Sequence, residues 1–310
     1  MSKYADILYK MLKSRLIEEQ LVSIIENKKE GFPLYSSVRQ EGLVGAVLAL
    51  GEDDILFNSH RNIASLIARD VDESLLIKEI LGYEDGICGG RCGASAINLA
   101  EEKIFSPFAD TSLNFARAVG VATSLKRRNL QGSVLCIVGD GACADGKFYE
   151  ALNIAAAKEL PIIFYIENNE YANRTHISSI HNIQDIAART KGYGIKSIII
   201  NGNDPVEVNM SIGAILENLK IKKEPYVVEA KTYRLIAHRY LDEQDYRTRE
   251  DIEQHLNEDP IELLVQYMYE HNLATREDLL NVRGLIEDEV KTLFEFYYGC
   301  DDELNCEEGE

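Results

Sequence analysis

The sequence predicts an α/β protein in which a parallel sheet is covered by helices on both faces. Short apolar runs rich in β-branched residues alternate with stretches of helical periodicity, as at 133–138, 146–158 and 161–166. The runs are apolar throughout instead of alternating with polar residues, which is typical of strands buried on both faces. The repeated order of strand, helix and strand favours parallel pairing.

The other elements can be read along the chain in order. Residues 7–27 repeat apolar side chains at spacings of three and four, which predicts a helix, and helical patterns continue to about residue 81. Glycines concentrate at 82–95, which predicts a loop with sharp backbone turns. The remaining expected elements are helices at 112–128, 146–158, 206–219 and 260–298, and strands at 133–138, 161–166, 195–200 and 226–230.

The chain carries no Pro-, Gly- or Ser-rich linker, so we expect residues 1–300 to form a single domain. Its helical N-terminal part covers about 1–81, and its helical C-terminal part covers about 251–300. Residues 301–310 form an acidic tail that we expect to be frayed.

The charge balance limits the classes of partner. The chain has 33 Lys and Arg against 52 Asp and Glu, which gives a formal net charge of −19. A field of this sign repels nucleic-acid phosphates and anionic lipids, so we expect no nucleic-acid partner and no membrane association. An anionic ligand must therefore be held locally, by a helix N-terminus, a metal ion or a well-placed Arg.

The cellular compartment follows from what the sequence lacks. Six cysteines in 310 residues are too few for a disulfide scaffold. The first twenty residues are charged throughout, unlike a secretory leader. We expect a cytoplasmic protein, or one of an organelle matrix if a leader has been removed.

Polar residues follow two neighbouring strands at the points where the strands end. The run 133–138 leads into Gly139-Asp140-Gly141, and the run 161–166 leads into Asn169, 29 residues after Asp140. Ligands of open parallel sheets bind at the carboxyl ends of the strands, and Mg²⁺ prefers carboxylate and amide oxygens. The spacing therefore predicts a Mg²⁺ and diphosphate site, although both motifs also occur in ordinary turns.

The segment GDGACADGKFYEALNIAAAKELPIIFYIENNEYA (139–172) resembles the thiamine-diphosphate motif of a known family. The family is the alpha subunit of the decarboxylase component of 2-oxo acid dehydrogenase complexes, which includes pyruvate, branched-chain 2-oxo acid and acetoin dehydrogenases. Weaker islands follow in the family's order: RQEGLVGAVLAL, NSHRN, GYGIKSIIINGNDP, TYRLIAH, YRTREDIE and EDPIELL. The resemblance implies the thiamine-diphosphate-binding fold, with helical N- and C-terminal additions.

The resemblance also implies a ligand set for Mg²⁺. Asp140 and Asn169 would bind the ion through side-chain oxygens, and Tyr171 through its main-chain carbonyl. The diphosphate of thiamine diphosphate would complete the coordination.

Further roles in cofactor binding and catalysis follow from the same resemblance. Gly139, Gly141 and Ala142 would lie along the diphosphate, and Arg61 would pair with a phosphate oxygen through its guanidinium fork. His238, in the loop after Thr-Tyr-Arg, would transfer a proton or orient the reacting acyl group, and it would contact the cofactor.

The sequence departs from the family at three histidine positions. Many relatives carry imidazoles where this chain has Ile63, Ile97 and Ile236. We expect these changes to make the pocket drier and less basic, which favours an apolar substrate or a different acyl acceptor. Arg239 stands where some relatives carry a phosphorylated Ser, so we do not expect that mode of control.

The resemblance implies partner subunits. In the family, the carboxylate that acts on the cofactor's aminopyrimidine belongs to a separate beta subunit, and the acyl unit passes to a lipoyl acyltransferase. We therefore expect an assembly of two alpha and two beta chains acting on a 2-oxo acid or acetoin. No second α/β half follows in these 310 residues, so we expect the chain alone to bind the diphosphate weakly and to catalyse nothing.

The sequence is also compatible with two other functions. A transketolase-type half enzyme would use the same Asp and Asn ligands, although TYRLIAH and YRTREDIE favour the dehydrogenase branch. A non-catalytic scaffold or regulatory subunit that kept the fold would explain the three isoleucines.

Overall fold

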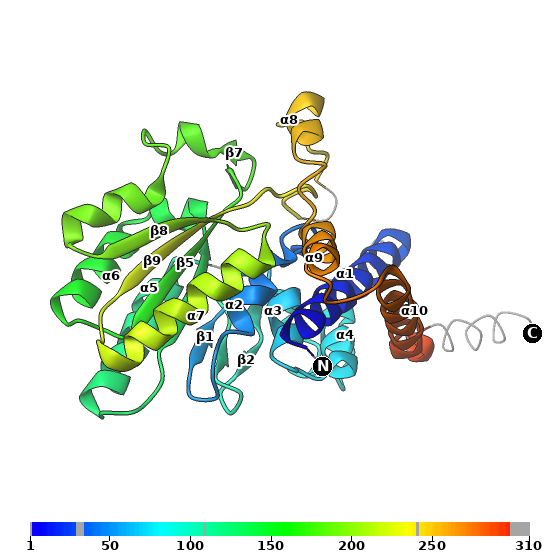
Figure 1. Ribbon diagram of the computed structural model, residues 1–310, viewed down its shortest axis with the longest axis horizontal. Helices are drawn as coiled ribbons and strands as arrows, with labels where there is room; N and C mark the ends of the chain where they lie inside the picture. Colours follow the sequence, from blue (N-terminus) through cyan, green and yellow to red (C-terminus); the bar gives the residue numbers. More distant parts are fainter. Residues whose placement is uncertain (1, 29–33, 108–109, 240–241, 298–310) are drawn as a thin grey trace, which may run out of the picture.

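A seven-stranded sheet forms the centre of the computed structural model, which describes residues 2–28, 34–107, 110–239 and 242–297 (Figure 1). The strand order is β2-β3-β1-β4-β5-β9-β8, and a separate two-stranded sheet pairs β6 with β7. The strands are β1 (Ile55–Phe57), β2 (Asn98–Leu99), β3 (Ile104–Phe105), β4 (Val134–Gly139), β5 (Ile162–Asn168), β6 (Tyr171–Ala172), β7 (Thr175–His176), β8 (Lys196–Asn201) and β9 (Tyr226–Lys231).

The pairing confirms the predicted parallel sheet. All neighbours from β3 to β8 run parallel, and only the short edge strand β2 pairs antiparallel. The four strands predicted from apolar runs appear as β4, β5, β8 and β9. In the central pair, Gly139 of β4 lies opposite Glu167 of β5. The two strands therefore end at the same edge of the sheet, and Asp140 lies close to the end of β5.

Ten α-helices lie in the described part of the chain. They are α1 (Lys3–Lys28), α2 (Val44–Val47), α3 (Ile63–Ala68), α4 (Glu73–Leu81), α5 (Leu113–Arg127), α6 (Gly146–Ala157), α7 (Pro205–Ile221), α8 (Arg249–Gln254), α9 (Pro260–Glu270) and α10 (Arg276–Leu293). The expected loop at 82–95 contains no α-helix or strand, and backbone N–H groups of Cys88, Gly90 and Cys92 donate to the Glu79 carboxylate.

The sheet is covered on both faces, as the sequence predicts. Helices α5 and α6 pack on one face, against strand residues such as Cys136 and Phe164. Helices α1, α2, α3, α7 and α9 belong to the core of the other face, with residues such as Leu135 and Ile163. Neighbouring residues of one strand thus enter different cores, which explains why the runs are apolar throughout.

The N- and C-terminal helical parts lie side by side on one side of the molecule. Helix α1 contacts α3, α9 and α10 (Figure 1). The expectation that 1–81 is helical was incomplete, because this range also holds strand β1. Three residues are too short to show a period, so only their pairing with β3 and β4 reveals the strand.

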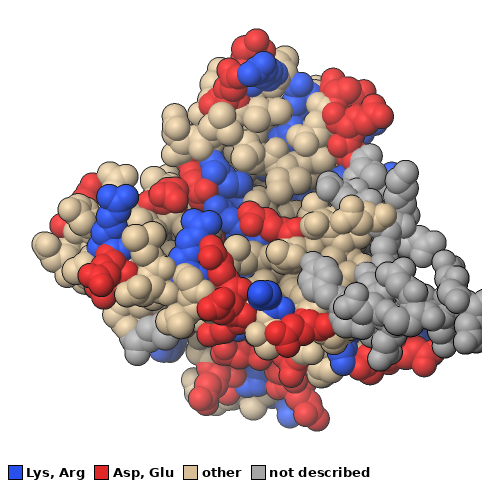
Figure 2. Space-filling model, turned by 90° about the vertical axis from the view of Figure 1, so that its right-hand side faces the viewer, with Lys and Arg blue, Asp and Glu red and all other residues tan. Residues whose placement is uncertain are grey.

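The expected helix at 260–298 is also two helices, α9 and α10, and residues 271–275 separate them. Thr275 caps the second helix by accepting from the Asp278 N–H. Tyr298 and the acidic tail 301–310 lie outside the described residues. Figure 2 shows Asp and Glu side chains gathered on the lower part of one face, in keeping with the net charge of −19. Within the described ranges, each helix is too short or too polar to serve as a membrane span.

Candidate active site

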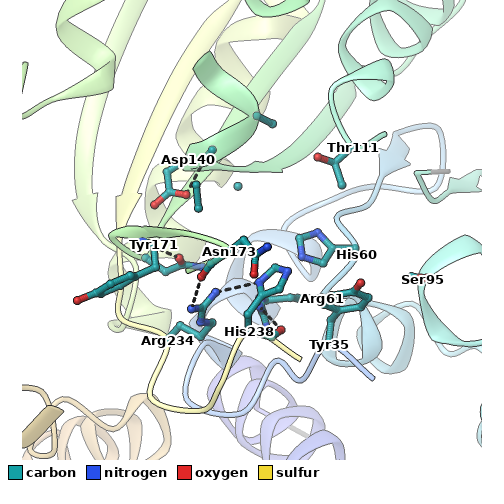
Figure 3. Close-up of a pocket in the computed structure, with 15 residues that line it drawn as sticks. Tyr35, His60, Arg61, Ser95, Thr111, Asp140, Tyr171, Asn173, Arg234 and His238 are labelled. Atoms are coloured by element: carbon teal, nitrogen blue, oxygen red, sulfur yellow. Dashed lines mark hydrogen bonds between the residues drawn. The ribbon is translucent and has the colours of Figure 1, made fainter. Parts of the chain in front are cut away.

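A cavity of ≈ 360 Å³ opens at the carboxyl ends of β4 and β5 (Figure 3). Parallel sheets bind ligands at this edge because the connections that leave the strands there diverge. The cavity is lined by Tyr35, His60, Arg61, Ser95, Thr111, Gly139, Asp140, Gly141, Ala142, Asn169, Tyr171, Ala172, Asn173, Arg234 and His238.

The eight residues predicted from the sequence all line this one cavity. They are Arg61, Gly139, Asp140, Gly141, Ala142, Asn169, Tyr171 and His238. They come from four separate stretches of the chain, so only the fold brings them together. Their individual roles in cofactor and metal binding stay predictions.

Asp140 carries a buried carboxylate oxygen without a partner. Its side chain is 2% exposed. Oδ1 accepts the Gly141 N–H at 2.6 Å, but Oδ2 has no hydrogen-bond partner among the residues that the structure describes. Burial raises the pKa of this carboxyl to about 6. An unpaired buried oxygen is costly, so the arrangement suits a group that receives a cation.

Asn169 and Tyr171 contribute to the cavity in different ways. The Asn169 amide donates to Gln40 Oε1 at 3.4 Å, and its Oδ1 accepts the Tyr171 N–H at 3.3 Å. The Tyr171 ring turns away from Asp140, and its hydroxyl donates to Asp251 Oδ2 at 2.9 Å (Figure 3). Only the backbone of Tyr171 is therefore available as a ligand on the cavity side.

The turn after β4 lies where the sequence predicts it, between the strand and a helix that was expected at 146–158. A 3₁₀ helix at Asp140–Ala144 occupies this turn. Helix α6 begins only at Gly146, and Asp145 caps it by accepting the Lys147 N–H at 2.9 Å. This N–H group at the start of α6 is therefore already bonded within the chain. Gly141 is required because an added Cβ would lie 2.6 Å from the Ala172 Cβ.

Two buried guanidinium groups lie around His238. Arg61 donates to Ser36 O at 2.8 Å and to His238 O at 2.7 Å. Arg234 donates to Asn173 O at 2.8 Å, and its Nε has no partner in the part of the chain that the structure describes. Burial and the neighbouring Arg234 lower the pKa of Arg61 to about 9. Among the described lining residues Asp140 is the single carboxylate, so the cavity favours an anion.

The tautomer of His238 follows from its neighbours. Its Nδ1 lies 3.1 Å from Arg61 Nη2 and 3.0 Å from Arg234 Nη1. Guanidinium groups only donate, so Nδ1 must accept and Nε2 carries the proton. Burial, followed by the charges of Arg61 and Arg234, lowers the pKa of His238 to about 3. The imidazole is therefore neutral at physiological pH and offers a donor at Nε2.

His60 is a second imidazole of the cavity. It is half-buried, but both of its ring nitrogens are buried, and neither has a hydrogen-bond partner in the described part of the chain. Burial lowers its pKa well below the usual range. Tyr35 makes edge contacts with both imidazoles, at centroid distances of 4.8 Å to His60 and 5.2 Å to His238.

Sequence reasoning missed several of the lining residues. Tyr35, Ser95, Thr111 and Asn173 had no signal of their own apart from proximity to motifs. Arg234 did have one, because it lies in the TYRLIAH island that supplied His238.

The three isoleucines at family histidine positions are not among the residues that line the cavity. Ile63 and Ile97 lie fully buried in the core with α3 and α4, and Ile236 is half-buried. The expectation that they make the pocket drier and less basic stays a prediction.

Comparisons of this chain with a family model and with curated proteins agree on the family that it is similar to. A family model described as dehydrogenase E1 component matches residues 9–297. The chain is 27% identical over 287 residues to pyruvate dehydrogenase E1 component subunit alpha of Rickettsia bellii, covering 92% of this chain and 88% of that protein. It is 30% identical over 252 residues to the protein of that name from Zymomonas mobilis, covering 81% and 71%. It is 32% identical over 250 residues to mitochondrial 2-oxoisovalerate dehydrogenase subunit alpha of Mus musculus, covering 79% and 57%.

Proposed function

Because this chain belongs to the dehydrogenase E1 component family and is the alpha subunit of a 2-oxo acid dehydrogenase, we propose that its cavity binds thiamine diphosphate through one Mg²⁺ ion. The observation that carries the proposal is the buried Oδ2 of Asp140, which has no partner within the described ranges and lies at the edge of the sheet where ligands bind.

The donor set fits a hard cation and a diphosphate. Asp140 Oδ2, the side-chain oxygen of Asn169 and the main-chain carbonyl of Tyr171 would supply oxygens to Mg²⁺, which prefers such ligands. Gly139, Gly141 and Ala142 have little or no side chain to block a diphosphate.

The local charge also fits. Arg61 and Arg234 are buried around the same cavity and add positive charge in a chain whose net charge is −19. Arg61 would contact a phosphate oxygen, because its fork now rests on neutral carbonyl and imidazole groups. Guanidinium groups bind phosphate in this bidentate manner.

His238 would orient the substrate by donation instead of acting as a base. Its Nδ1 accepts from two guanidinium groups, so its Nε2 proton is the one left to point at a carbonyl or carboxylate oxygen. Thiamine diphosphate supplies the electron sink that a 2-oxo acid needs to lose carbon dioxide. A preorganised donor at the reacting oxygen stabilises charge that develops there.

We further propose that the chain works with a beta subunit, in an assembly of two alpha and two beta chains. In this proposal it acts on a 2-oxo acid or acetoin, passes the acyl unit to a lipoyl acyltransferase and works in the cytoplasm. The relatives from Rickettsia and Zymomonas, which are bacterial alpha subunits, support these assignments. The family match over 9–297 does not favour a transketolase-type half enzyme.

Calorimetric titration of thiamine diphosphate into the chain with its beta subunit tests the proposal. We expect binding that requires Mg²⁺ and that Asp140→Ala weakens by at least about 100-fold. Asp54→Ala is a matched control, because Asp54 is also buried but lies at the opposite edge of the sheet, where it accepts from Ser133 N–H.

A panel of 2-oxo acids and acetoin with a dye acceptor then tests catalysis by the same assembly. Turnover by the wild type and none by Asp140→Ala supports an enzyme. Cofactor binding that Asp140→Ala leaves intact contradicts the proposed site, and binding without turnover on any substrate favours the scaffold.

A further inference from the structure

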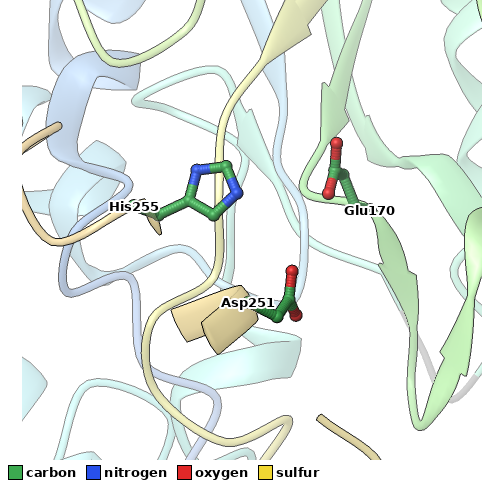
Figure 4. A group of neighbouring side chains, drawn as sticks. All are labelled: Glu170, Asp251 and His255. Atoms are coloured by element: carbon green, nitrogen blue, oxygen red, sulfur yellow. The ribbon is translucent and has the colours of Figure 1, made fainter. Parts of the chain in front are cut away.

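Three side chains with metal-ligand chemistry meet outside the cofactor cavity (Figure 4). Glu170 lies in the turn between β5 and β6, Asp251 lies on α8, and His255 follows the last turn of α8. One ligand atom from each lies within 4.8 Å of the others, and all three residues are half-buried. None of the three lines the cofactor cavity.

His255 is oriented as a metal-binding histidine would be. Its Nδ1 lies 3.0 Å from Glu258 Oε2, and a carboxylate only accepts, so Nδ1 carries a proton and, in the neutral ring, Nε2 is the nitrogen with the lone pair. The ring stacks on Tyr233, with centroids 3.9 Å apart and planes inclined by 9°. A carboxylate that fixes the second nitrogen is a usual support for an imidazole ligand.

Asp251 is held by two tyrosines. Its Oδ2 accepts the Tyr171 hydroxyl at 2.9 Å and the Tyr233 hydroxyl at 2.7 Å. These donors fix the direction of the carboxylate and leave Oδ1 for another partner.

The cluster has no cationic side chain of its own. Among the described residues, neither Glu170 nor Asp251 pairs with a Lys or Arg, and the one basic group paired with Glu170 is His176, whose Nε2 lies at 4.0 Å. Two carboxylates and an imidazole nitrogen therefore lie close together, and no Lys or Arg among the described residues forms an ion pair with either carboxylate.

We propose that Glu170, Asp251 and His255 bind one divalent transition-metal ion such as Zn²⁺. A cation at the centre of a triangle with sides of 4.8 Å lies about 2.8 Å from each corner, and Zn–O and Zn–N bonds are about 2.0–2.2 Å. Shifts of under about 1 Å in half-buried side chains close that difference. The nitrogen ligand favours Zn²⁺ over Mg²⁺, which prefers oxygen ligands alone.

The site has room for a fourth ligand. Glu170 and His255 also line a neighbouring cavity of ≈ 460 Å³, together with Asn203, Lys231 and Glu258. A water molecule or a small anionic ligand can reach the ion from that side. Three protein ligands with one open position is the arrangement of an accessible Zn²⁺ site.

The ion would join two parts of the fold. Glu170 directly follows Asn169 and directly precedes Tyr171, while Asp251 and His255 belong to the α8 segment. Binding would fasten α8 to the turn that carries two of the proposed Mg²⁺ ligands. We therefore expect backbone amides of α8 to exchange with solvent more slowly when the ion is bound.

Titration of Zn²⁺ against a coloured chelator tests this site in the full chain, after treatment with EDTA and in the presence of excess Mg²⁺. We expect one Zn²⁺ per chain, and at least tenfold weaker binding in both His255→Gln and Glu170→Gln. His271→Gln is the matched control, because His271 also follows the last turn of a helix and stacks on a tyrosine, Tyr267, at 4.1 Å.

Two further measurements distinguish loss of the metal site from unfolding of a variant and from damage to the cofactor cavity. Glu170 and His255 lie on different elements, so loss of Zn²⁺ in both variants with unchanged melting temperatures of the metal-free proteins excludes unfolding of α8 as the cause. Asp140→Ala must keep its Zn²⁺, since the site stands apart from the cofactor cavity. Zn²⁺ binding that is equal in wild type, His255→Gln and Glu170→Gln, or no binding at all, overturns the proposal.

Discussion

Two clusters of buried charge in this protein differ in how completely their groups are paired. In the first, Arg15 of α1 donates to both oxygens of Glu41 at 2.7 Å and to Asp259 at 2.7 and 2.9 Å. Arg39 adds a bond to Asp259 at 2.6 Å. In the second, the active-site cavity, Asp140 Oδ2 has no hydrogen-bond partner among the described residues.

This difference in pairing distinguishes charged groups that stabilise the fold from groups that stay unpaired until a ligand binds. The Arg15 cluster joins α1 to the turn before α2 and to the start of α9, so its pairs act within the chain. The cavity keeps an open carboxylate oxygen and the unpartnered ring nitrogens of His60. Unpaired buried groups reduce stability, and they are retained where binding needs them.

The largest effect is expected in the paired cluster. Arg15→Ala should lower the free energy of unfolding by about 3–5 kcal/mol, because it leaves Glu41 buried without its cation. Urea denaturation followed by circular dichroism measures the change. Arg283→Ala, which removes an exposed pair with Glu287, should change it by less than about 0.5 kcal/mol. Equal effects of the two substitutions would refute the structural role of the Arg15 cluster.

Glu18 of α1 extends the comparison, since it is hydrogen-bonded but pairs with no Lys or Arg among the described residues. It is buried and accepts the Ser37 N–H at 2.7 Å, and burial raises its pKa to about 7. Because the pKa is raised in the folded protein, the contribution of Glu18 to the free energy of unfolding is present below pH about 4.5 and is lost as pH rises through 7. Relative to Glu18→Gln, the wild type should lose about 3 kcal/mol of unfolding free energy over that interval. A difference between the two proteins that does not change with pH would contradict this.

His238 tests whether the cavity uses donation or proton transfer. In the assembly of alpha and beta chains, His238→Phe should lower kcat/KM by about 100-fold, because the Nε2 donor is lost. The pH profile of the wild type should show no limb from His238 between pH 5 and 8, since its pKa lies near 3. An acidic limb near pH 6.5 that disappears in His238→Phe would instead identify a general base.

Arg61→Lys should have a smaller effect on the cavity. The positive charge remains but the fork is lost, so we expect thiamine diphosphate to bind about tenfold more weakly. Calorimetry under the conditions used for the wild type gives the ratio. Unchanged affinity would show that Arg61 serves only its bonds to Ser36 and His238.

The sequence was sufficient to predict the central strands β4 and β5. It also predicted the positions at their carboxyl ends that carry the proposed ligands. Strands β4 and β5 are long, apolar and buried on both faces, so their ends could be located to within one or two residues. Parallel pairing then placed Asp140 and Asn169 on the same edge. This reasoning needed only local pattern and the direction of the strands.

Other features depend on tertiary structure that no local pattern encodes. Strand β1 has three residues, and only its neighbours β3 and β4 define it. Arg234 reaches the cavity because the loop after β9 folds back over β6, where it bonds Asn173 O. The direction of the Tyr171 ring is set by Asp251, eighty residues later. Long-range contacts of this kind appear only in the folded chain.

The most direct test of the central claim compares stability with ligand response in Asp140→Asn. Thermal denaturation of the assembly should show that, without ligand, the variant melts at the temperature of the wild type or higher, because a buried carboxylate with one unpaired oxygen has been neutralised. Addition of Mg²⁺ and thiamine diphosphate should raise the melting temperature of the wild type and leave the variant unchanged. A variant that is less stable without ligand but still responds fully to the cofactor would show that Asp140 serves the fold, as Arg15 does, and would contradict the claim.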